Sequence, residues 1–437
     1  MQQRKTIAVC TLGCKVNQYD TDAVLAQFKD AGYEVVDFDQ VADVYLINTC
    51  TVTNTGDRKS RQMIRRAHRS NPKARVVVMG CLAQASPDEV VEIEGVSLVV
   101  GTHQRQDLLR LVESLPDESH QPVSAVVDDI FAVDDFEELP VSTFEGRTRA
   151  ALKIQDGCDQ FCAYCRVPYA RGKPRSRKLS AVVEQAEEIV QKGYQEIVLT
   201  GVHLGAYGQD LRPQLHLADA IAALLPIKGL ERIRISSIDP HEITPALLDL
   251  VAHEHKVCPH LHIPLQSGSD AVLKRMRRRY TTSEYRRVVE QAYAMVPDLA
   301  VTTDVIVGFP GETDAEFEET LQFVESTGFS RLHVFRYSRR SGTPAARFPN
   351  QIPSSVKEER SRALISLGER LAARFHSRFV GRALSVLVEE VGAGRAEGLT
   401  GNYVRVEFPA ESDALVGKIV QVSAKTADEK GISGVLV

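Results

Sequence analysis

Short apolar runs alternate with amphipathic stretches along residues 1–112. The runs have the length and composition of buried parallel strands and lie at Thr6–Leu12, Val44–Thr49, Arg75–Met79 and Leu98–Val100. The stretches between them have helical spacing and lie near Asp20–Lys29, Arg58–His68 and Pro87–Ile93. This alternation predicts an α/β fold with a doubly wound parallel sheet.

The same alternation of strand and helix patterns recurs over residues 149–345. Six candidate strands lie at Ala151–Gln155, Glu196–Thr200, Arg232–Ser236, Leu261–Gln266, Ala300–Val307 and Arg331–Phe335. Thr313 and Glu316 have the spacing of a capping box, which predicts that a helix starts there. Six βα units predict a full or partial (β/α) barrel, with its chemistry at the carboxyl ends of the strands.

From about Phe379 the period of apolar positions changes to two. Four such runs, separated by glycines, lie at Ala383–Glu389, Tyr403–Phe408, Lys418–Ala424 and Gly434–Val437. They predict a small antiparallel β-barrel of the kind that often binds oligonucleotides. A purely structural cap would show the same alternation, so the pattern leaves both roles open.

These changes of pattern predict four segments. They are an N-terminal domain (1–112), an acidic linker (113–148), a barrel domain (149–376) and a C-terminal barrel (377–437). The linker has clustered acidic residues and no clear periodicity, so it is expected to be solvated.

Composition places the chain among ordinary globular proteins. Its 437 residues are 43% hydrophobic and 25% charged, with a net charge of −5, which excludes disordered, collagen-like and coiled-coil chains. No apolar run approaches the ~20 residues of a membrane span, and the N-terminus lacks the apolar stretch of a signal peptide. We therefore expect a cytoplasmic protein without a membrane partner, in which disulfides are disfavoured.

Three of the eight cysteines form a compact motif. Cys158, Cys162 and Cys165 have the spacing C-x3-C-x2-C and directly follow the first predicted barrel strand. Thiolates at this spacing can wrap one face of a cubane iron–sulfur cluster and leave one iron open. Zinc is the alternative, but it needs a fourth protein ligand, and the second tight cysteine pair typical of zinc sites does not occur here.

Three other cysteines each follow a predicted strand of the N-terminal sheet. Cys14, Cys50 and Cys81 are far apart in sequence, yet the carboxyl ends of parallel strands share one edge of a sheet. Gly13 and Gly80 would allow tight backbone turns beside a cluster. Three independently buried cysteines remain an equal alternative on this reasoning. The remaining two, Cys10 and Cys258, are best explained as small core residues.

The C-x3-C-x2-C motif after a first barrel strand resembles the radical S-adenosylmethionine (SAM) superfamily. The resemblance implies that Cys158, Cys162 and Cys165 hold a [4Fe–4S] cluster whose open iron binds SAM, which is cleaved to a 5′-deoxyadenosyl radical. The segment Val305–Glu312 resembles the strand end that lines SAM, so Gly308 and Gly311 are candidate SAM contacts. A turn before Thr313 explains these glycines equally well.

Further motifs resemble the methylthiotransferases of that superfamily. The matching segments are Thr11–Asp20, Asn48–Thr53, Met79–Gln84, Cys165–Gly172 and, resembling a TRAM domain, Glu397–Thr400 with Gly401–Tyr403. The resemblance implies a transferase with a second [4Fe–4S] cluster on Cys14, Cys50 and Cys81, which carries the transferred sulfur. It also implies a reductant such as a flavodoxin or ferredoxin, and a sulfur donor. Arg166 departs from the aliphatic residue expected after Cys165.

Three basic runs favour a nucleic-acid partner despite the net negative charge. They are Arg58, Lys59, Arg61, Arg65, Arg66 and Arg69; Arg166, Arg171, Lys173, Arg175, Arg177 and Lys178; and Lys274, Arg275, Arg277, Arg278 and Arg279. Two of these runs adjoin cysteine motifs, which fits a surface that tracks phosphates. Since unstacked bases of RNA loops can enter a pocket, a residue in an RNA loop is the predicted target. The resemblance to the methylthiotransferases implies that this partner is the anticodon loop of a tRNA.

Finer resemblance indicates the substrate. The segments Gly13–Gln18, Thr200–Gly208 and Arg234–Pro240 resemble the branch that methylthiolates C2 of N6-threonylcarbamoyladenosine (t6A) at position 37 of tRNA, beside the anticodon. Methylthiolation of isopentenyladenosine in tRNA, or of a ribosomal protein, are the alternative activities. A non-catalytic RNA-binding protein with structural zinc is the alternative outside enzymes.

Overall fold

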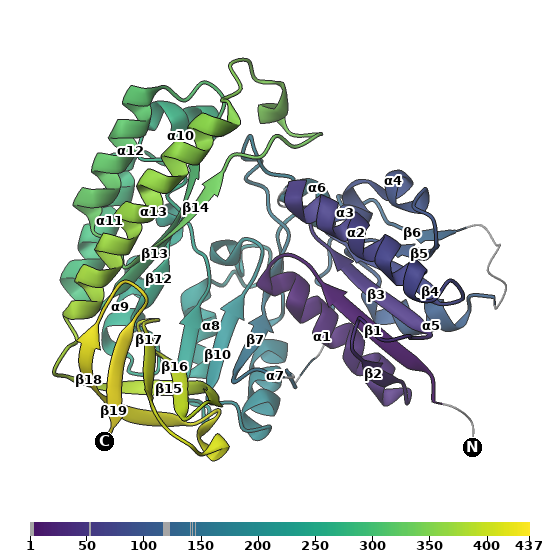
Figure 1. Cartoon of the computed structure of the whole chain (residues 1–437), viewed down its shortest axis with the longest axis horizontal. Helices are drawn as coiled ribbons and strands as arrows, with labels where there is room; N and C mark the ends of the chain where they lie inside the picture. The colour runs from purple at the N-terminus through teal and green to yellow at the C-terminus, as the bar shows by residue number, and fades with distance from the viewer. Residues whose placement is uncertain (1–3, 52–53, 117–122, 140, 142, 145) are drawn as a thin grey trace.

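The computed structural model describes residues 4–51, 54–116, 123–139, 141, 143–144 and 146–437. Figure 1 shows three bodies of regular structure, with an N-terminal sheet at the right, a central barrel and a small C-terminal barrel in yellow. Within the described ranges, every helix is too short or too polar to traverse a lipid bilayer.

Six parallel strands form the N-terminal sheet in the order β2-β1-β3-β4-β5-β6. They are β1 (Thr6–Thr11), β2 (Glu34–Val36), β3 (Val44–Thr49), β4 (Arg75–Gly80), β5 (Val96–Val100) and β6 (Ser124–Val126). The helices are α1 (Lys15–Asp30), α2 (Asn54–Ser70), α3 (Cys81–Ala85), α4 (Pro87–Val91) and α5 (Leu108–Glu113). Ile47 and Val78 belong to one hydrophobic cluster and Leu46 and Val77 to another, because successive strand residues face opposite sides. Apolar cores on both faces confirm the doubly wound sheet.

The central body is a partial barrel of six strands. One sheet contains β7 (Arg149–Lys153), β10 (Glu196–Thr200) and β11 (Arg232–Ile235); the other contains β12 (His260–His262), β13 (Ala300–Val307) and β14 (Arg331–Arg336). Two parallel bridges, Ile233 with Val257 and Ser237 with His262, join them. Among the described residues no ladder joins β14 back to β7, so the barrel is open on that side.

Helices cover the outside of the partial barrel, as Figure 1 shows. They are α7 (Leu179–Gln191), α8 (Leu217–Leu224), α9 (Pro245–His253), α10 (Asp270–Met276), α11 (Thr282–Met295), α12 (Asp314–Thr327) and α13 (Ser354–Ser377). The predicted capping box before α12 is confirmed, since the Thr313 hydroxyl accepts a bond of 3.2 Å from the Glu316 amide. Between β7 and α7, β8 (Gln155–Asp156) pairs with β9 (Arg175–Ser176), and α6 (Val167–Arg171) lies in the loop between them.

The C-terminal body is a closed barrel of order β15-β16-β17-β19-β18. Its strands are β15 (Ala383–Gly392), β16 (Arg395–Thr400), β17 (Arg405–Pro409), β18 (Ile419–Ala427) and β19 (Ile432–Leu436). The predicted small barrel is confirmed, with one parallel pair, β17 with β19. The sequence pattern missed β16, where Gly398 interrupts the apolar alternation. A Cβ at this position would lie 2.1 Å from the Leu387 carbonyl oxygen, so the close strand contact requires glycine.

Two arginines attach this small barrel to the amino ends of the central strands. Arg232 donates to the Ser385 carbonyl at 2.7 Å, and Arg234 donates to the Gly401 carbonyl at 2.8 Å. Arg234 also donates to the Glu196 carboxylate at 2.6 Å. The small barrel therefore covers the amino ends of the central strands.

The acidic segment differs from the solvated linker that its composition predicts. Leu139, Val141 and Phe144 are buried in the core of the central barrel. Glu137 is buried too, and its carboxylate pairs with Arg105 at 2.7 Å. The segment thus packs between the two larger bodies, because its few apolar residues and one buried acid outweigh its overall charge. The segment boundaries themselves stay a prediction.

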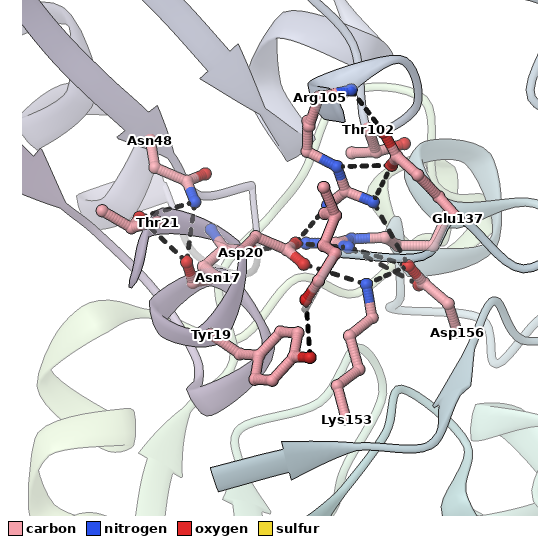
Figure 2. A network of polar contacts seen from close by, with 12 residues as sticks. Asn17, Tyr19, Asp20, Thr21, Asn48, Thr102, Arg105, Glu137, Lys153 and Asp156 are labelled. Carbon is pink, nitrogen blue, oxygen red and sulfur yellow. Dashed lines mark hydrogen bonds and ion pairs between the residues drawn. The ribbon is translucent and has the colours of Figure 1, made fainter. Parts of the chain in front are cut away.

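A buried network of ion pairs joins the N-terminal sheet to the central barrel (Figure 2). Arg171 contacts Asp20 of α1 at 2.8 Å and Asp156 of β8 at 3.1 Å. Lys153 contacts the same two carboxylates at 2.9 and 2.6 Å, and Arg105 also pairs with Asp20. Burial alone would raise the pKa of the Asp156 carboxyl, but the cations hold that pKa well below its usual range. These groups are therefore charged and mutually dependent.

We expect the Arg105→Met variant to lose about 3 to 5 kcal/mol of unfolding free energy, because it leaves the buried Glu137 carboxylate without a cation and removes one of the three cations around Asp20. Chemical denaturation measures this loss. Arg110→Met is the matched control, since Arg110 is 70% exposed and, among the described residues, forms an ion pair only with Asp107, at 3.4 Å. If Arg105→Met loses less than about 0.5 kcal/mol of unfolding free energy, as the control should, the network does not stabilise the interface.

Candidate functional site

Three cysteines that are far apart in sequence meet at one edge of the N-terminal sheet. Cys14 follows β1 and immediately precedes α1, Cys50 follows β3, and Cys81 begins α3 directly after β4. A Cβ at Gly13 would lie 3.0 Å from the Cys50 sulfur. Burial raises the pKa of the Cys81 thiol, and the nearby Cys14 thiol raises it further. The structure therefore brings the three thiols together, while their role as ligands stays a prediction.

Gly80 is required by the local geometry beside Cys81. Its φ is +98°, a conformation that strains other residues. A Cβ there would lie 2.2 Å from the Asn48 side-chain oxygen and 2.7 Å from the Thr49 carbonyl oxygen. The close approach of β3 and β4 at this edge therefore depends on glycine.

Asn17 of the N-terminal domain and Arg171 of the central body both lie beside the Cys81 sulfur. Asn17, on the first turn of α1, donates to the Leu12 and Thr49 carbonyls at 2.8 and 2.9 Å. Its side-chain oxygen accepts a bond of 2.7 Å from Arg171, which also donates to the Cys81 sulfur at 3.4 Å. Sequence reasoning included both residues in motifs but gave neither this role, because no local pattern reveals such a contact.

The second set of cysteines occupies the loop after β8. The Cys165 amide donates to the Cys162 carbonyl at 3.0 Å and shapes a tight turn. Backbone amides also point at sulfurs, from Gln160 to Cys158 at 3.5 Å and from Val167 to Cys165 at 3.4 Å. Burial raises the pKa of the Cys165 thiol to about 12. Binding of a metal centre to these thiols would therefore release protons.

Two further side chains contact this second set. Arg278 donates to the Cys162 sulfur at 3.4 Å and pairs with Asp239. His203 lies near the Cys158 thiol and pairs with Glu242 at 2.5 Å. Burial lowers the pKa of His203, but these two partners outweigh burial and raise it to about 10. Positive groups thus surround both cysteine sets, as thiolate-bound clusters require.

The spacing of the sulfurs distinguishes a cluster from zinc. Tetrahedral zinc with bonds of about 2.3 Å needs sulfurs roughly 4 Å apart, whereas the sulfurs around a cubane lie farther apart. Within the described residues, two groups of three metal-ligating atoms lie within 4.8 Å of one another, and neither contains a cysteine. They are His262, Asp304 and His333, and His203, Asp239 and Glu242. The thiol geometry therefore fits clusters better than one zinc ion.

Gly308 and Gly311 have ordinary structural explanations. Their φ values are +70° and +76°, and a Cβ at Gly308 would lie 2.3 Å from the Lys357 side chain. The Gly308 amide also donates to the Glu312 carboxylate at 2.6 Å. The turn after β13 thus accounts for both glycines, and their contact with SAM stays a prediction.

The two cysteine sets face the same interface between the N-terminal sheet and the central barrel. Arg340 lies near both sets: burial lowers the pKa of its guanidinium, and the nearby thiols of Cys50 and Cys165 oppose that shift. It is 2% exposed and donates to the Thr51 hydroxyl at 2.8 Å and to Asp57 at 3.1 Å. Its position follows only from tertiary packing, so no sequence motif locates it.

The three basic runs have different fates in the structure. In the first, the exposed face of α2 forms a groove lined by Asn54, Asp57, Arg58, Arg61, Gln62, Arg65 and Arg69. In the second, Arg171, Arg175 and Arg177 are buried, so the expectation that this run tracks phosphates is wrong for them. In the third, Arg275 forms an ion pair with Glu316 and Arg278 forms one with Asp239. The α2 groove is therefore the basic surface best suited to RNA.

Of the two cysteines outside the sets, Cys10 packs against an apolar core, as expected, whereas Cys258 is buried near Arg234 and Glu196. Cys258 is 2% exposed, and burial raises the pKa of its thiol to about 11. Cys10 is half-buried and packs against the core around Ile47.

Comparisons with known proteins agree with this architecture. Residues 152–324 match the radical SAM superfamily, and residues 6–101 match an uncharacterized protein family, UPF0004. The structure of the radical SAM methyltransferase TsrM from Kitasatospora setae is similar with a TM-score of 0.57 and 15% identity, over 90% of this chain and 81% of that chain. This similarity concerns the fold. The superfamily implies one [4Fe–4S] cluster and SAM.

Curated relatives extend the similarity over nearly the whole chain. The threonylcarbamoyladenosine tRNA methylthiotransferase MtaB of Bacillus subtilis is 48% identical over 95% of this chain and 93% of that protein. The enzyme of the same name from Aquifex aeolicus is 42% identical over 95% of this chain and 99% of that protein. A tRNA-2-methylthio-N(6)-dimethylallyladenosine synthase of Moorella thermoacetica is 34% identical over 100% of this chain and 99% of that protein. With two facing cysteine sets and relatives of this identity, the chain belongs to the radical SAM tRNA methylthiotransferases.

Proposed function

We propose that this enzyme inserts a methylthio group at C2 of N6-threonylcarbamoyladenosine at position 37 of tRNA. The observation that carries the proposal is the meeting of two cysteine sets at one buried interface, with Arg340 near both. A methylthiotransferase needs its radical source and its sulfur source to reach the same substrate atom. Two sets facing one interface meet that need.

The choice of nucleoside is supported by the relatives. Those named for threonylcarbamoyladenosine are 48% and 42% identical to this chain, whereas one named for dimethylallyladenosine is 34% identical. Dimethylallyladenosine, the isopentenyl nucleoside, is therefore the second candidate substrate. A protein substrate is disfavoured by the basic groove on α2, whose arginines suit the phosphates of an anticodon stem.

In this proposal Cys158, Cys162 and Cys165 hold the cluster that binds SAM, and Cys14, Cys50 and Cys81 hold a second [4Fe–4S] cluster. When bound, these groups supply radical chemistry and the transferred sulfur. The protein orients them through N–H donors, since Arg171 bonds to the Cys81 sulfur at 3.4 Å and Arg278 to the Cys162 sulfur at 3.4 Å. A reductant such as a flavodoxin or ferredoxin and a separate sulfur donor complete the system, which we place in the cytoplasm.

Nucleoside mass spectrometry of total tRNA, from the host with and without this gene, tests the substrate directly. We expect loss of 2-methylthio-t6A and accumulation of t6A in the deletion strain. Loss of the methylthio-isopentenyl nucleoside instead would retain the chemistry and overturn the substrate. Unchanged tRNA would exclude both nucleosides and favour a protein substrate.

Because the two cysteine sets have different proposed roles, loss of a ligand from the N-terminal set should abolish methylthiolation but not SAM cleavage. We expect Cys14→Ala to retain reductive cleavage of SAM, measured as 5′-deoxyadenosine, and to lose methylthiolation by at least about a hundredfold, since each metal centre depends on its own ligands. Cys10→Ala is the matched control and should retain both, because Cys10 only packs against a core. Loss of SAM cleavage in Cys14→Ala alone would contradict the assignment.

Metal content gives an independent test. After anaerobic reconstitution we expect about eight irons per chain, four for each cubane cluster. The Cys14→Ala variant should bind about four, and Cys10→Ala about eight. Bound zinc without sulfide would support a structural-zinc protein, and about four irons in the wild type would remove the second cluster.

A further inference from the structure

A group of polar side chains lies where the start of α1 meets the amino ends of the central strands and the small barrel. We call it the Tyr403 cluster, and its members are Lys15, Arg149, Glu196, Arg234, His260 and Tyr403. Arg149, Glu196 and His260 are the first residues of β7, β10 and β12. Tyr403 comes from the turn between β16 and β17, and Lys15 directly follows Cys14. All three bodies of the protein therefore contribute to it.

Cations surround the Tyr403 ring. The Arg234 guanidinium carbon lies 4.7 Å from the ring centre and that of Arg149 lies 5.5 Å from it. The His260 ring stacks on Tyr403 at 4.7 Å. Burial would raise the pKa of the Tyr403 hydroxyl, yet the charges of Lys15, Arg149 and Arg234 outweigh burial and lower it. The field at the Tyr403 hydroxyl thus favours negative charge.

Lys15 is the cation of this cluster that lacks a counter-charge in direct contact. Arg149 pairs with Glu389 at 2.8 Å and Arg234 with Glu196 at 2.6 Å. Lys15 is exposed, and its ammonium group makes no hydrogen bond or ion pair with the part of the chain that the structure describes. Its ammonium group is therefore available to an anion.

His260 provides a second unsatisfied group. It is 4% exposed, and its Nε2 contacts the Thr302 hydroxyl at 3.1 Å. Its Nδ1 is buried and has no partner within the described residues. Unpaired buried polar atoms are rare and costly, so this nitrogen points to a polar ligand. Arg149 and Tyr403 are only half-buried, which leaves the cluster accessible.

We propose that the Tyr403 cluster is a carboxylate subsite, in which Lys15 binds the threonyl carboxylate of N6-threonylcarbamoyladenosine. This inference rests on the proposed function and deepens it. The threonyl group carries a full negative charge at neutral pH, whereas an isopentenyl group is uncharged and apolar. An accessible ammonium group in a positive field attracts the threonyl carboxylate. An isopentenyl group would displace water from that ammonium group without replacing the lost interactions, so its binding is penalised.

The location of Lys15 fits this role. It follows Cys14 at the start of α1, so the group that recognises the N6 substituent lies beside a thiol of the proposed sulfur-carrying set. A base bound through its carboxylate would be fixed in orientation as well as selected, since one anchored end limits rotation of the whole base. Lys15 is thus a specificity-determining residue that touches substrate and not a cluster ligand.

Equilibrium binding of RNA tests the subsite without turnover. The full-length reconstituted enzyme is titrated with anticodon stem-loop RNAs that carry t6A, its carboxyl methyl ester or unmodified adenosine at position 37. We expect the wild type to bind the acid about tenfold more tightly than the ester, as for one partly buried charge pair. Lys15→Gln should reduce this preference to less than about twofold, and Lys15→Arg should retain part of it.

Lys59→Gln is the matched control, because Lys59 is exposed on α2 and lies outside the cluster. It should weaken binding of all three RNAs by the same factor, as expected for a phosphate contact. An equal loss for acid and ester in Lys15→Gln would likewise assign Lys15 to RNA phosphates and overturn the subsite. So would an undiminished preference in Lys15→Gln.

The nucleoside analysis separates failure of the subsite from failure of the proposed function. If deletion of the gene removes 2-methylthio-t6A but the wild type binds acid and ester alike, the subsite is wrong and the function stands. If deletion removes the methylthio-isopentenyl nucleoside, both are wrong.

Discussion

The buried ion network around Asp20 and Asp156 fixes the geometry on which the rest of the structure depends. Three members are tied to cysteine motifs, because Asp20 lies on the helix that Cys14 precedes, Asp156 immediately precedes the Cys158 loop, and Arg171 ends the helix that follows Cys165. Their contacts of 2.8 to 3.1 Å therefore hold the two thiol sets at one interface. Arg171 extends this coupling to the Cys81 sulfur itself. Such a network stabilises the fold only while every charge is paired, which makes the relative placement of the two bodies an all-or-none property.

Local patterns predicted those parts of the fold that local physics determines. The apolar runs at Val44–Thr49 and Ala300–Val307 coincide with β3 and β13, because fully buried strands need continuous apolar sequence. The edge shared by Cys14, Cys50 and Cys81 followed from strand polarity alone. Long-range packing was not predictable in this way. The acidic segment is the clearest case, since the burial of Glu137 depends on Arg105, which lies outside the segment.

Charge runs proved the least informative sequence feature, and the reason is physical. A run such as Arg171, Arg175 and Arg177 looks the same whether its side chains face solvent or buried carboxylates. Only tertiary partners distinguish the two, and here Arg177 contacts Glu138 at 2.7 Å while Arg171 contacts Asp20. The run on α2 differs because Ile64 and Ala67 use the buried face of the helix and its arginines occupy the other. Amphipathic spacing around a basic run is therefore a better indicator of an RNA surface than the number of charges.

The separation of chemistry from recognition explains how one architecture can serve different nucleosides. The thiols lie at strand ends and on a short loop, where glycines such as Gly80 and close packing fix them. The proposed carboxylate subsite lies instead on the first turn of α1, on strand starts and on a turn of the small barrel. Substitution of an exposed side chain such as Lys15 disturbs no buried pair, whereas substitution at Asn17 would break bonds to two strand ends. Selectivity for the N6 substituent can therefore change without loss of the cluster geometry, because Lys15, the residue proposed to discriminate, makes none of the buried contacts that hold the bodies together.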